Sequence, residues 1–187
     1  ELDQARTQAR LLSIRGQAER AERGERWQDA IALFNEALAI DALILYANEG
    51  MARARPRADL DERLEAIVSE KNRLIDRRVL RLAQETLDEA QRVPSPGTRL
   101  QRQIMAASAT IDYATTPVTI EMNSDGLTDI TVLRVQRLGL IQQQILTLRP
   151  GTYTAVGMRN GFRDVRIQFE VQPGQLNAVD VRCVEAI

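Results

Sequence analysis

The chain has 187 residues, of which 44% are hydrophobic and 27% are charged, a composition of folded globular proteins that excludes a disordered or collagen-like chain. Its 25 basic and 26 acidic side chains give a formal net charge of -1, so no overall positive field favours nucleic acid or an anionic membrane as a partner. The sequence contains no histidine and one cysteine, Cys183, which excludes an internal disulfide and nearly every familiar transition-metal ligand set.

Residues 1–92 form the first predicted domain, in which apolar residues lie three and four positions apart. This spacing predicts antiparallel helices. We expect the first helix to end at Gly24 and the second to span residues 27–40. Their apolar faces consist of Leu11, Leu12, Ile14 and Ala18 in the first helix and of Ala30, Leu33, Phe34, Ala37 and Leu38 in the second. One helical hairpin cannot bury its own apolar face, so we expect such hairpins to stack.

Three more helices are predicted in this domain. The first starts near Ala42 and ends around Arg55, because Pro56 disfavours helical geometry in the residue before it. Asp59, followed three positions later by Glu62, is typical of a capping box and predicts the start of the next helix. The expected apolar positions are Leu60, Leu64, Ile67 and Val68 in that helix and Val79, Leu80, Ala83, Leu87 and Ala90 in the last.

Residues 11–56 resemble the tetratricopeptide repeat family. The family has a small residue in the first helix of a repeat, an aromatic that opens the second, and small, aromatic, small and leucine positions at fixed steps after it. The matching residues are Ala18, Trp27, Ala30, Phe34, Ala37 and Leu38. Ala42 stands where the family usually has proline, and the next unit keeps Ala52 at the small position without the aromatic signature. A plain helical bundle is the alternative.

This resemblance implies a surface for a protein partner. In the family, the first helix of each repeat lines the concave face. Carried over by position, this places on that face Arg15 and Glu19 from the first unit and Tyr46, Glu49 and Arg53 from the second. Arginine and tyrosine often dominate the binding energy of protein interfaces. The alternative is that these five side chains are simply solvated.

Residues 93–115 are predicted to be a linker and a connecting helix. The sequence VPSPG, at 93–97, stops the preceding helix with two prolines and a glycine. Thr98 can then cap a new helix, because a threonine hydroxyl accepts a hydrogen bond from the first free backbone amides. This helix carries one apolar face, formed by Leu100, Ile104, Ala107 and Ile111.

Residues 116–187 form the second predicted domain, where apolar residues alternate with polar ones as in strands. Turn sequences such as NSDG, RPG, RNG and QPG separate the apolar runs. The six expected strands lie at 117–122, 129–135, 144–148, 153–158, 165–171 and 178–184. The pattern predicts a small β-sandwich or barrel. The chain is therefore expected to have an α+β fold, with antiparallel helical hairpins followed by a small β-sandwich.

The second domain resembles PEGA-type domains, which are small β-sandwich modules of bacterial surface and envelope proteins. The resemblance covers about residues 116–185 and depends on a Leu-x-Pro-Gly-x-Tyr hairpin at 148–153, followed by the pair Gly161-Phe162 and by Gly174 before the last strand. The middle segment LRVQRLGLIQQ, at 133–143, is longer than usual in the family.

Catalytic and metal-binding patterns were sought in the same residues. Without histidine, no Ser-His or Cys-His pair can form. Cys183 lies in an alternating run and is expected to be a buried small residue, with a free thiol as the alternative. Asp125 and Asp129 flank Gly126 as in a calcium loop, but the series of oxygen ligands is incomplete, which favours a solvated turn. We expect no catalytic site, no cofactor and no metal.

The sequence therefore favours a non-enzymatic scaffolding module that binds a protein partner. The two resemblances imply a periplasmic or other extracytoplasmic bacterial setting, with membrane attachment only through a segment upstream of Glu1, because no apolar run in the chain reaches the roughly 20 residues of a membrane span. The alternatives are a peptidoglycan or polysaccharide-binding module, with cell-wall contact through the second domain, and a sensor domain of a larger membrane signalling protein. A third alternative is an enzyme whose catalytic groups are carboxylates alone.

Overall fold

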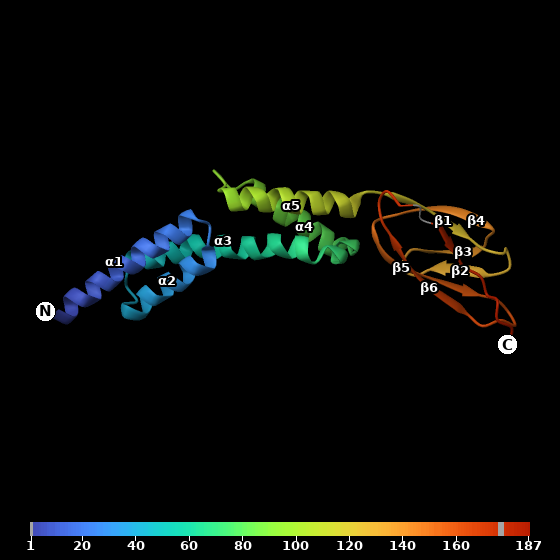
Figure 1. Cartoon of the computed structure of the whole chain (residues 1–187), viewed down its shortest axis with the longest axis horizontal. Coiled ribbons are helices and arrows are strands. Elements are labelled where there is room, and N and C mark those ends of the chain that lie inside the picture. The colour runs from blue at the N-terminus through green and yellow to red at the C-terminus, as the bar shows by residue number, and fades with distance from the viewer. Residues whose placement is uncertain (1, 176–177) are drawn as a thin grey trace. The chain divides into compact units, whose positions relative to one another are not determined.

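The computed structural model describes residues 2–175 and 178–187. In these residues, helices come first and strands follow, which confirms the predicted α+β fold (Figure 1). The chain divides into two compact units, one formed by residues 1–71 and 80–110 and the other by residues 72–79 and 111–187. We refer to them as unit 1 and unit 2 and describe each by itself.

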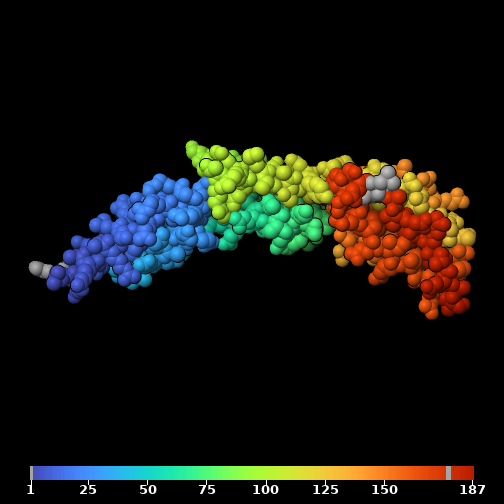
Figure 2. Space-filling model, in the orientation of Figure 1, coloured from blue at the N-terminus to red at the C-terminus, as the bar shows by residue number. Residues whose placement is uncertain are grey.

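The first half of unit 1 is built from α1 (Leu2–Arg23), α2 (Trp27–Ile40) and the first turns of α3 (Leu45–Ser69). These helices lie side by side, and their atoms form one packed body (Figures 1 and 2). Phe34 is 1% exposed and lies directly against the α3 backbone, since a Cβ atom on Gly50 would be 2.2 Å from its Cζ. The remaining core consists of Ile14, Ala18, Ala21, Ala30, Ala37, Ala47, Met51 and Ala54.

Helix α3 continues through Pro56, so the prediction of a helix end at Arg55 and a new start at Asp59 is wrong. A proline in a helix leaves the carbonyl four residues earlier without its usual donor. Here that carbonyl belongs to Ala52, and both residues are on the exposed side, where water can solvate it. The opposite side of α3 buries Ala54, Ala58, Leu60 and Leu64, and this burial favours an unbroken helix.

Positions predicted to be buried that are exposed include Leu12 at 70%, Val68 at 41%, and Ala52. Leu12 lies two residues from the buried Ile14, about 200° around a helix with 3.6 residues per turn. Ala52 is likewise two residues from Gly50, which is the small residue that contacts Phe34. The predicted packing position at Ala52 is therefore wrong by half a turn.

The second half of unit 1 combines the C-terminal part of α3 with most of α4 (Arg77–Gln91) and most of α5 (Thr98–Thr115). Arg63 of α3 binds Glu89 of α4 at 2.8 Å. Arg99 of α5 forms a two-bond fork with Asp61 of α3, with N–O distances of 2.7 and 2.8 Å. The predicted apolar faces of α4 and α5 are confirmed at their buried members, Leu80, Ala83, Ala90, Leu100, Ala107 and Ile111.

Glu25 connects the two halves of unit 1. It has a φ of 52° and occupies the left-handed position after α1. Its buried carboxylate accepts the backbone amides of Arg99 at 2.7 Å and Leu100 at 3.2 Å, and the Arg57 guanidinium donates to it at 3.1 Å. Glu25, rather than the predicted Thr98, therefore caps the start of α5.

Unit 2 contains two sheets. In the first, β1 (Val118–Asn123) lies between the antiparallel β4 (Gln143–Leu148) and the parallel β7 (Ala178–Asp180). In the second, the antiparallel order is β3 (Gln136–Leu140), β2 (Asp129–Val132), β5 (Gly151–Met158) and β6 (Val165–Val171). Both sheets contribute to one apolar core, which includes Ile120, Met122, Ile130, Val132, Leu146, Ala155, Val171 and Val181. A short 3-10 helix, Lys71–Ile75, precedes α4, and most of it also belongs to unit 2.

Two of the predicted strands differ from the structure. The segment 129–135 is strand β2 only to Val132, and its last residues form a turn that leads into β3, which the sequence analysis missed. The segment 178–184 is a strand only to Asp180. Beyond it, Ser124 Oγ donates to the Val181 carbonyl at 2.7 Å and Thr128 Oγ1 accepts the Cys183 amide at 3.2 Å. Cys183 is 1% exposed, which confirms that it is buried.

Candidate functional site

The five residues predicted for a partner surface lie on α1 and on the first turns of α3. The structure brings them together in pairs. The Arg15 guanidinium lies 5.4 Å from the centre of the Tyr46 ring, and its Nε donates to Glu19 at 2.9 Å. The negative charges of Glu19 and Glu49 both stabilise the charged form of Arg53. We call this set the α1/α3 surface.

Glu22 belongs to the same surface and was missed by the sequence analysis. Arg53 donates two bonds to its carboxylate, from Nε at 3.2 Å and from Nη2 at 3.1 Å. These bonds to Glu22 raise the pKa of Arg53 above its usual value, burial opposes this rise, and the negative charges of the nearby carboxylates add to it. A positional signal was available, because positions 15, 19 and 22 share one helix face.

A hollow of about 250 Å³ lies at one end of the α1/α3 surface, lined by Gln8, Leu11, Leu12, Arg15 and Tyr46. The Tyr46 hydroxyl donates to the Leu11 carbonyl at 3.2 Å, which fixes the ring at the hollow. Burial raises the pKa of Tyr46, and the charge of Arg15 opposes this rise. Since Leu12 is 70% exposed, the hollow presents an apolar side chain next to the charged Arg15.

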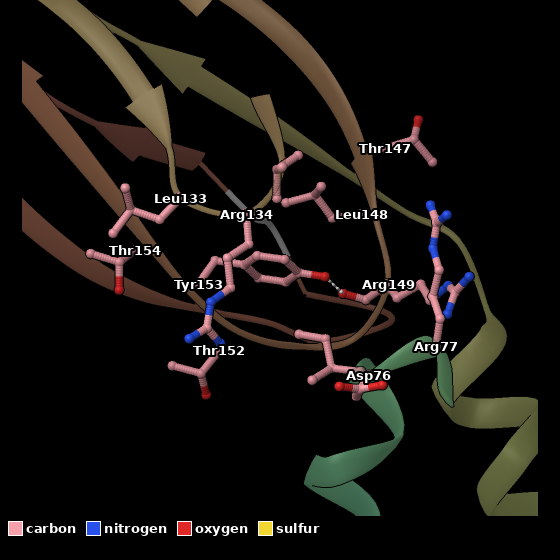
Figure 3. A pocket seen from close by; sticks show the side chains of 12 residues that line it. Asp76, Arg77, Leu133, Arg134, Thr147, Leu148, Arg149, Thr152, Tyr153 and Thr154 are labelled. Carbon is pink, nitrogen blue, oxygen red and sulfur yellow. Dashed lines mark hydrogen bonds between the residues drawn. The ribbon is translucent and has the colours of Figure 1, made fainter. Parts of the chain in front are cut away.

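A second concave feature is a cavity of about 660 Å³ in unit 2 (Figure 3). Residues 75–77, the β2–β3 turn, the end of β4 and the first residues of β5 line it. Leu148, Arg149 and Tyr153 of the Leu-x-Pro-Gly-x-Tyr hairpin are part of this lining. The sequence analysis used the hairpin only as a sign of the fold and did not identify it as a possible site.

The aspartates considered for a calcium loop have other partners. Asp125 accepts the backbone amides of Leu127 and Thr128, both at 2.9 Å, and lies 3.3 Å from Arg159. The hydrogen bond from the Leu127 backbone amide is the largest cause of the lowered pKa of Asp125. Asp129 pairs with Arg137. In the described part of the chain, no three or more Asp, Glu, Cys or His side chains gather in a way that could hold a metal ion.

Comparison of the chain with protein-family models gave no match. Comparison with curated proteins gave none either. Among the described residues, no helix combines the length and the apolar character needed to cross a membrane.

Proposed function

We propose that the chain is a non-enzymatic module that binds a protein partner through the α1/α3 surface. The observation that carries this proposal is the contact of Arg15 with Tyr46 at the hollow beside Leu12, with Arg53 on the same surface bound to Glu22. Buried arginine and tyrosine side chains are the residue types that most often dominate interface energies.

Pre-ordering of these side chains favours binding. Tyr46 is held by its bond to the Leu11 carbonyl, and Arg53 by its two bonds to Glu22. A partner would therefore immobilise fewer free rotamers, each of which costs about 0.5–1.5 kcal/mol on association. The carboxylates of Glu19, Glu22 and Glu49 outnumber the two arginines of this surface. We infer a partner that inserts an apolar side chain at Leu12 and presents basic groups to these carboxylates.

We place this function in the bacterial envelope, as the resemblances to tetratricopeptide repeats and PEGA-type domains imply, with membrane attachment only through a segment outside this chain. The glycan-binding alternative needs free aromatic faces for sugar stacking. In unit 2, Tyr153 and Phe169 stack on each other with 5.8 Å between ring centres, and the Arg159 guanidinium lies 4.1 Å from the centre of the Phe162 ring. Aromatic residues make up 4% of the chain, and these three rings each have one face in contact within unit 2, so few free aromatic faces are available for sugars.

The test is a pull-down from a bacterial envelope extract. The intact chain is compared with the triple variant Arg15→Ala, Tyr46→Ala, Arg53→Ala. A second triple variant, Arg81→Ala, Arg92→Ala, Tyr113→Ala, removes the same residue types from exposed positions in α4, directly after α4 and in α5.

We expect a protein that the intact chain and the second triple variant retain and that the first variant loses, identified by mass spectrometry and then confirmed with the purified partner. Circular dichroism checks that both variants remain folded. If the first variant stays folded and keeps every partner of the intact chain, the α1/α3 surface is not the binding site.

A further inference from the structure

The cavity of unit 2 carries a second inference, which is independent of the partner surface. Its volume, about 660 Å³, falls within the roughly 300–1,000 Å³ typical of small-molecule sites. The wall combines apolar side chains such as Leu133 and Leu148 with the hydroxyl groups of threonines. Such a mixture of apolar wall and a few polar groups is typical of ligand pockets.

Three arginines give the cavity its charge: Arg77, Arg134 and Arg149. None of them forms an ion pair with another residue in the part of the chain that the structure describes. The one carboxylate of the lining, Asp76, is used to cap α4, since its Oδ1 accepts the Arg78 amide at 2.7 Å. The wall therefore carries three guanidinium charges against one carboxylate, which leaves it positively charged.

Arg149 is the arginine of the cavity with an unsatisfied buried donor. Its Nη1 atom is buried and has no hydrogen-bond partner among the described residues. A buried donor without an acceptor is costly, and most such groups in proteins are paired. The other buried guanidinium atom of this kind, Arg57 Nε, belongs to a side chain that already binds Glu25 and lies 4.9 Å from the centre of the Trp27 ring. Arg149 has neither kind of compensation.

The Arg149 backbone is held in place at the cavity wall. The Tyr153 hydroxyl donates to the Arg149 carbonyl at 3.0 Å, as Figure 3 shows. Burial raises the pKa of Tyr153, and the positive charge of Arg149 opposes this rise. In the view of Figure 3, Arg77 and Arg149 are drawn at one end of the cavity, and Arg134 lies beyond the Tyr153 ring.

Arg134 occupies a turn position that an arginine seldom takes. Its φ is 63°, in the left-handed region that glycine or asparagine adopts at lower energy. The turn between β2 and β3 therefore keeps a guanidinium at the cavity at the expense of backbone strain. This adds a third positive charge to the wall.

We propose that this cavity binds a small organic oxyanion, a phosphate ester or a carboxylate, through the guanidinium of Arg149, with Arg77 at the same end of the cavity and Arg134 as a further positive charge on the wall. Planar guanidinium groups bind both phosphate and carboxylate oxygens through paired, charge-assisted hydrogen bonds. The hydroxyls of Thr147, Thr152 and Thr154 supply further donors, and the apolar side chains of the wall contact the carbon frame of the ligand.

The test is isothermal titration calorimetry on the full chain with three matched probes. Glucose 6-phosphate and glucuronate carry a phosphate and a carboxylate on the same sugar frame, and glucose is the neutral control. We expect one-to-one binding of at least one anion with a Kd below about 1 mM and no binding of glucose. The relative affinity of the two anions identifies the phosphate or the carboxylate as the preferred group.

Two variants locate the site. Arg149→Gln removes the charge at the cavity and is expected to weaken anion binding about tenfold or more. Arg166→Gln removes the same charge from an exposed position of β6 outside the cavity lining, and it should change the affinity by less than about twofold, as for a distant exposed charge. If circular dichroism shows that Arg149→Gln has unfolded unit 2, Arg77→Gln takes its place with the same expectation.

Four outcomes overturn the proposal: no binding of either anion, binding of glucose as tight as that of the anions, unchanged affinity in the cavity variant, or equal losses in the cavity variant and in Arg166→Gln. The last outcome would mean that the anions respond only to the net charge of the chain.

Discussion

The contact between Phe34 and Gly50 predicts that Gly50→Ala destabilises the chain, whereas Gly→Ala in a helix usually stabilises it. At an unobstructed position inside a helix, Gly→Ala stabilises by about 1 kcal/mol, because alanine has less backbone entropy to lose on folding. At Gly50 the new Cβ atom would lie 2.2, 2.4 and 2.6 Å from three carbons of the Phe34 ring. Non-bonded carbons need about 3.5–4.0 Å. The ring or the helix must therefore move by more than about 1 Å.

The expected size of the effect follows from these distances. Overpacking a core costs about 1–3 kcal/mol. The upper part of this range applies here, since Phe34 is 1% exposed and three of its ring atoms are affected at once. After subtraction of the gain in helix propensity, Gly50→Ala should lower the free energy of unfolding by about 1–2 kcal/mol.

Two comparisons isolate the contact. Gly16→Ala is the matched control, because its Cβ atom would meet only the end of Arg20 at 3.5 Å, and it should stabilise the chain. In a Phe34→Leu background, the ring is absent and Gly50→Ala should also become stabilising. Such a change of sign is a coupling between the two positions.

The measurement is urea denaturation followed by fluorescence. Trp27 is the only tryptophan of the chain and packs against the same core as Phe34. Its emission therefore reports on unit 1. Stabilisation by Gly50→Ala as large as that by Gly16→Ala would refute the packing of the Phe34 ring against α3.

Three further predictions concern unit 1. Phe34→Ala should lower the free energy of unfolding by about 3–5 kcal/mol, the usual range for a buried ring, in the same fluorescence assay; a change in melting temperature of a degree or less would contradict it. Glu25→Gln keeps the shape of the side chain but removes its charge, and it should cost about 1.5–3 kcal/mol, as expected for lost charge-assisted hydrogen bonds; equal midpoints in urea would show that the carboxylate does not stabilise the start of α5. Burial raises the pKa of Asp61, but hydrogen bonds from Arg99 and Gln103 outweigh it and lower the pKa below the usual value. The stabilisation by this carboxylate is therefore complete above about pH 4 and is lost as the pH falls through the lowered pKa. Asp61→Asn should thus destabilise the chain more at pH 7 than at pH 2; equal losses at both pH values would disprove this linkage.

The periodic segments of the fold were predictable from the sequence. The apolar spacing in residues 27–40 and in most of the strands reflects burial on one side, which any packed helix or sheet requires. The local rule failed at Pro56, where buried residues on both sides of the proline keep α3 continuous. Strand β3 was missed because it lies at the edge of its sheet, where its five residues are exposed or half-buried and show little alternation.

The parts of the sites that depend on distant residues were not predictable. The five residues of the α1/α3 surface were predicted to lie together from a resemblance in spacing. The same spacing could have identified Glu22, which shares a helix face with Arg15 and Glu19. The role of Glu25 at α5 involves a contact across 74 positions of sequence, and the three arginines of the cavity come from separate segments. No spacing rule connects such residues, because only the folded chain brings them together.

The contact made by Glu25 also determines how unit 1 opens. The first amides of a helix have no partner within the helix and ordinarily exchange with solvent hydrogen at once. In α5, the amides of Arg99 and Leu100 are instead bound to a carboxylate located between α1 and α2. Their exchange therefore requires the connection between α1 and α2 to separate from α5, rather than fraying of α5 alone. The start of α5 and the first helical hairpin consequently share one opening event, although they are far apart in the sequence.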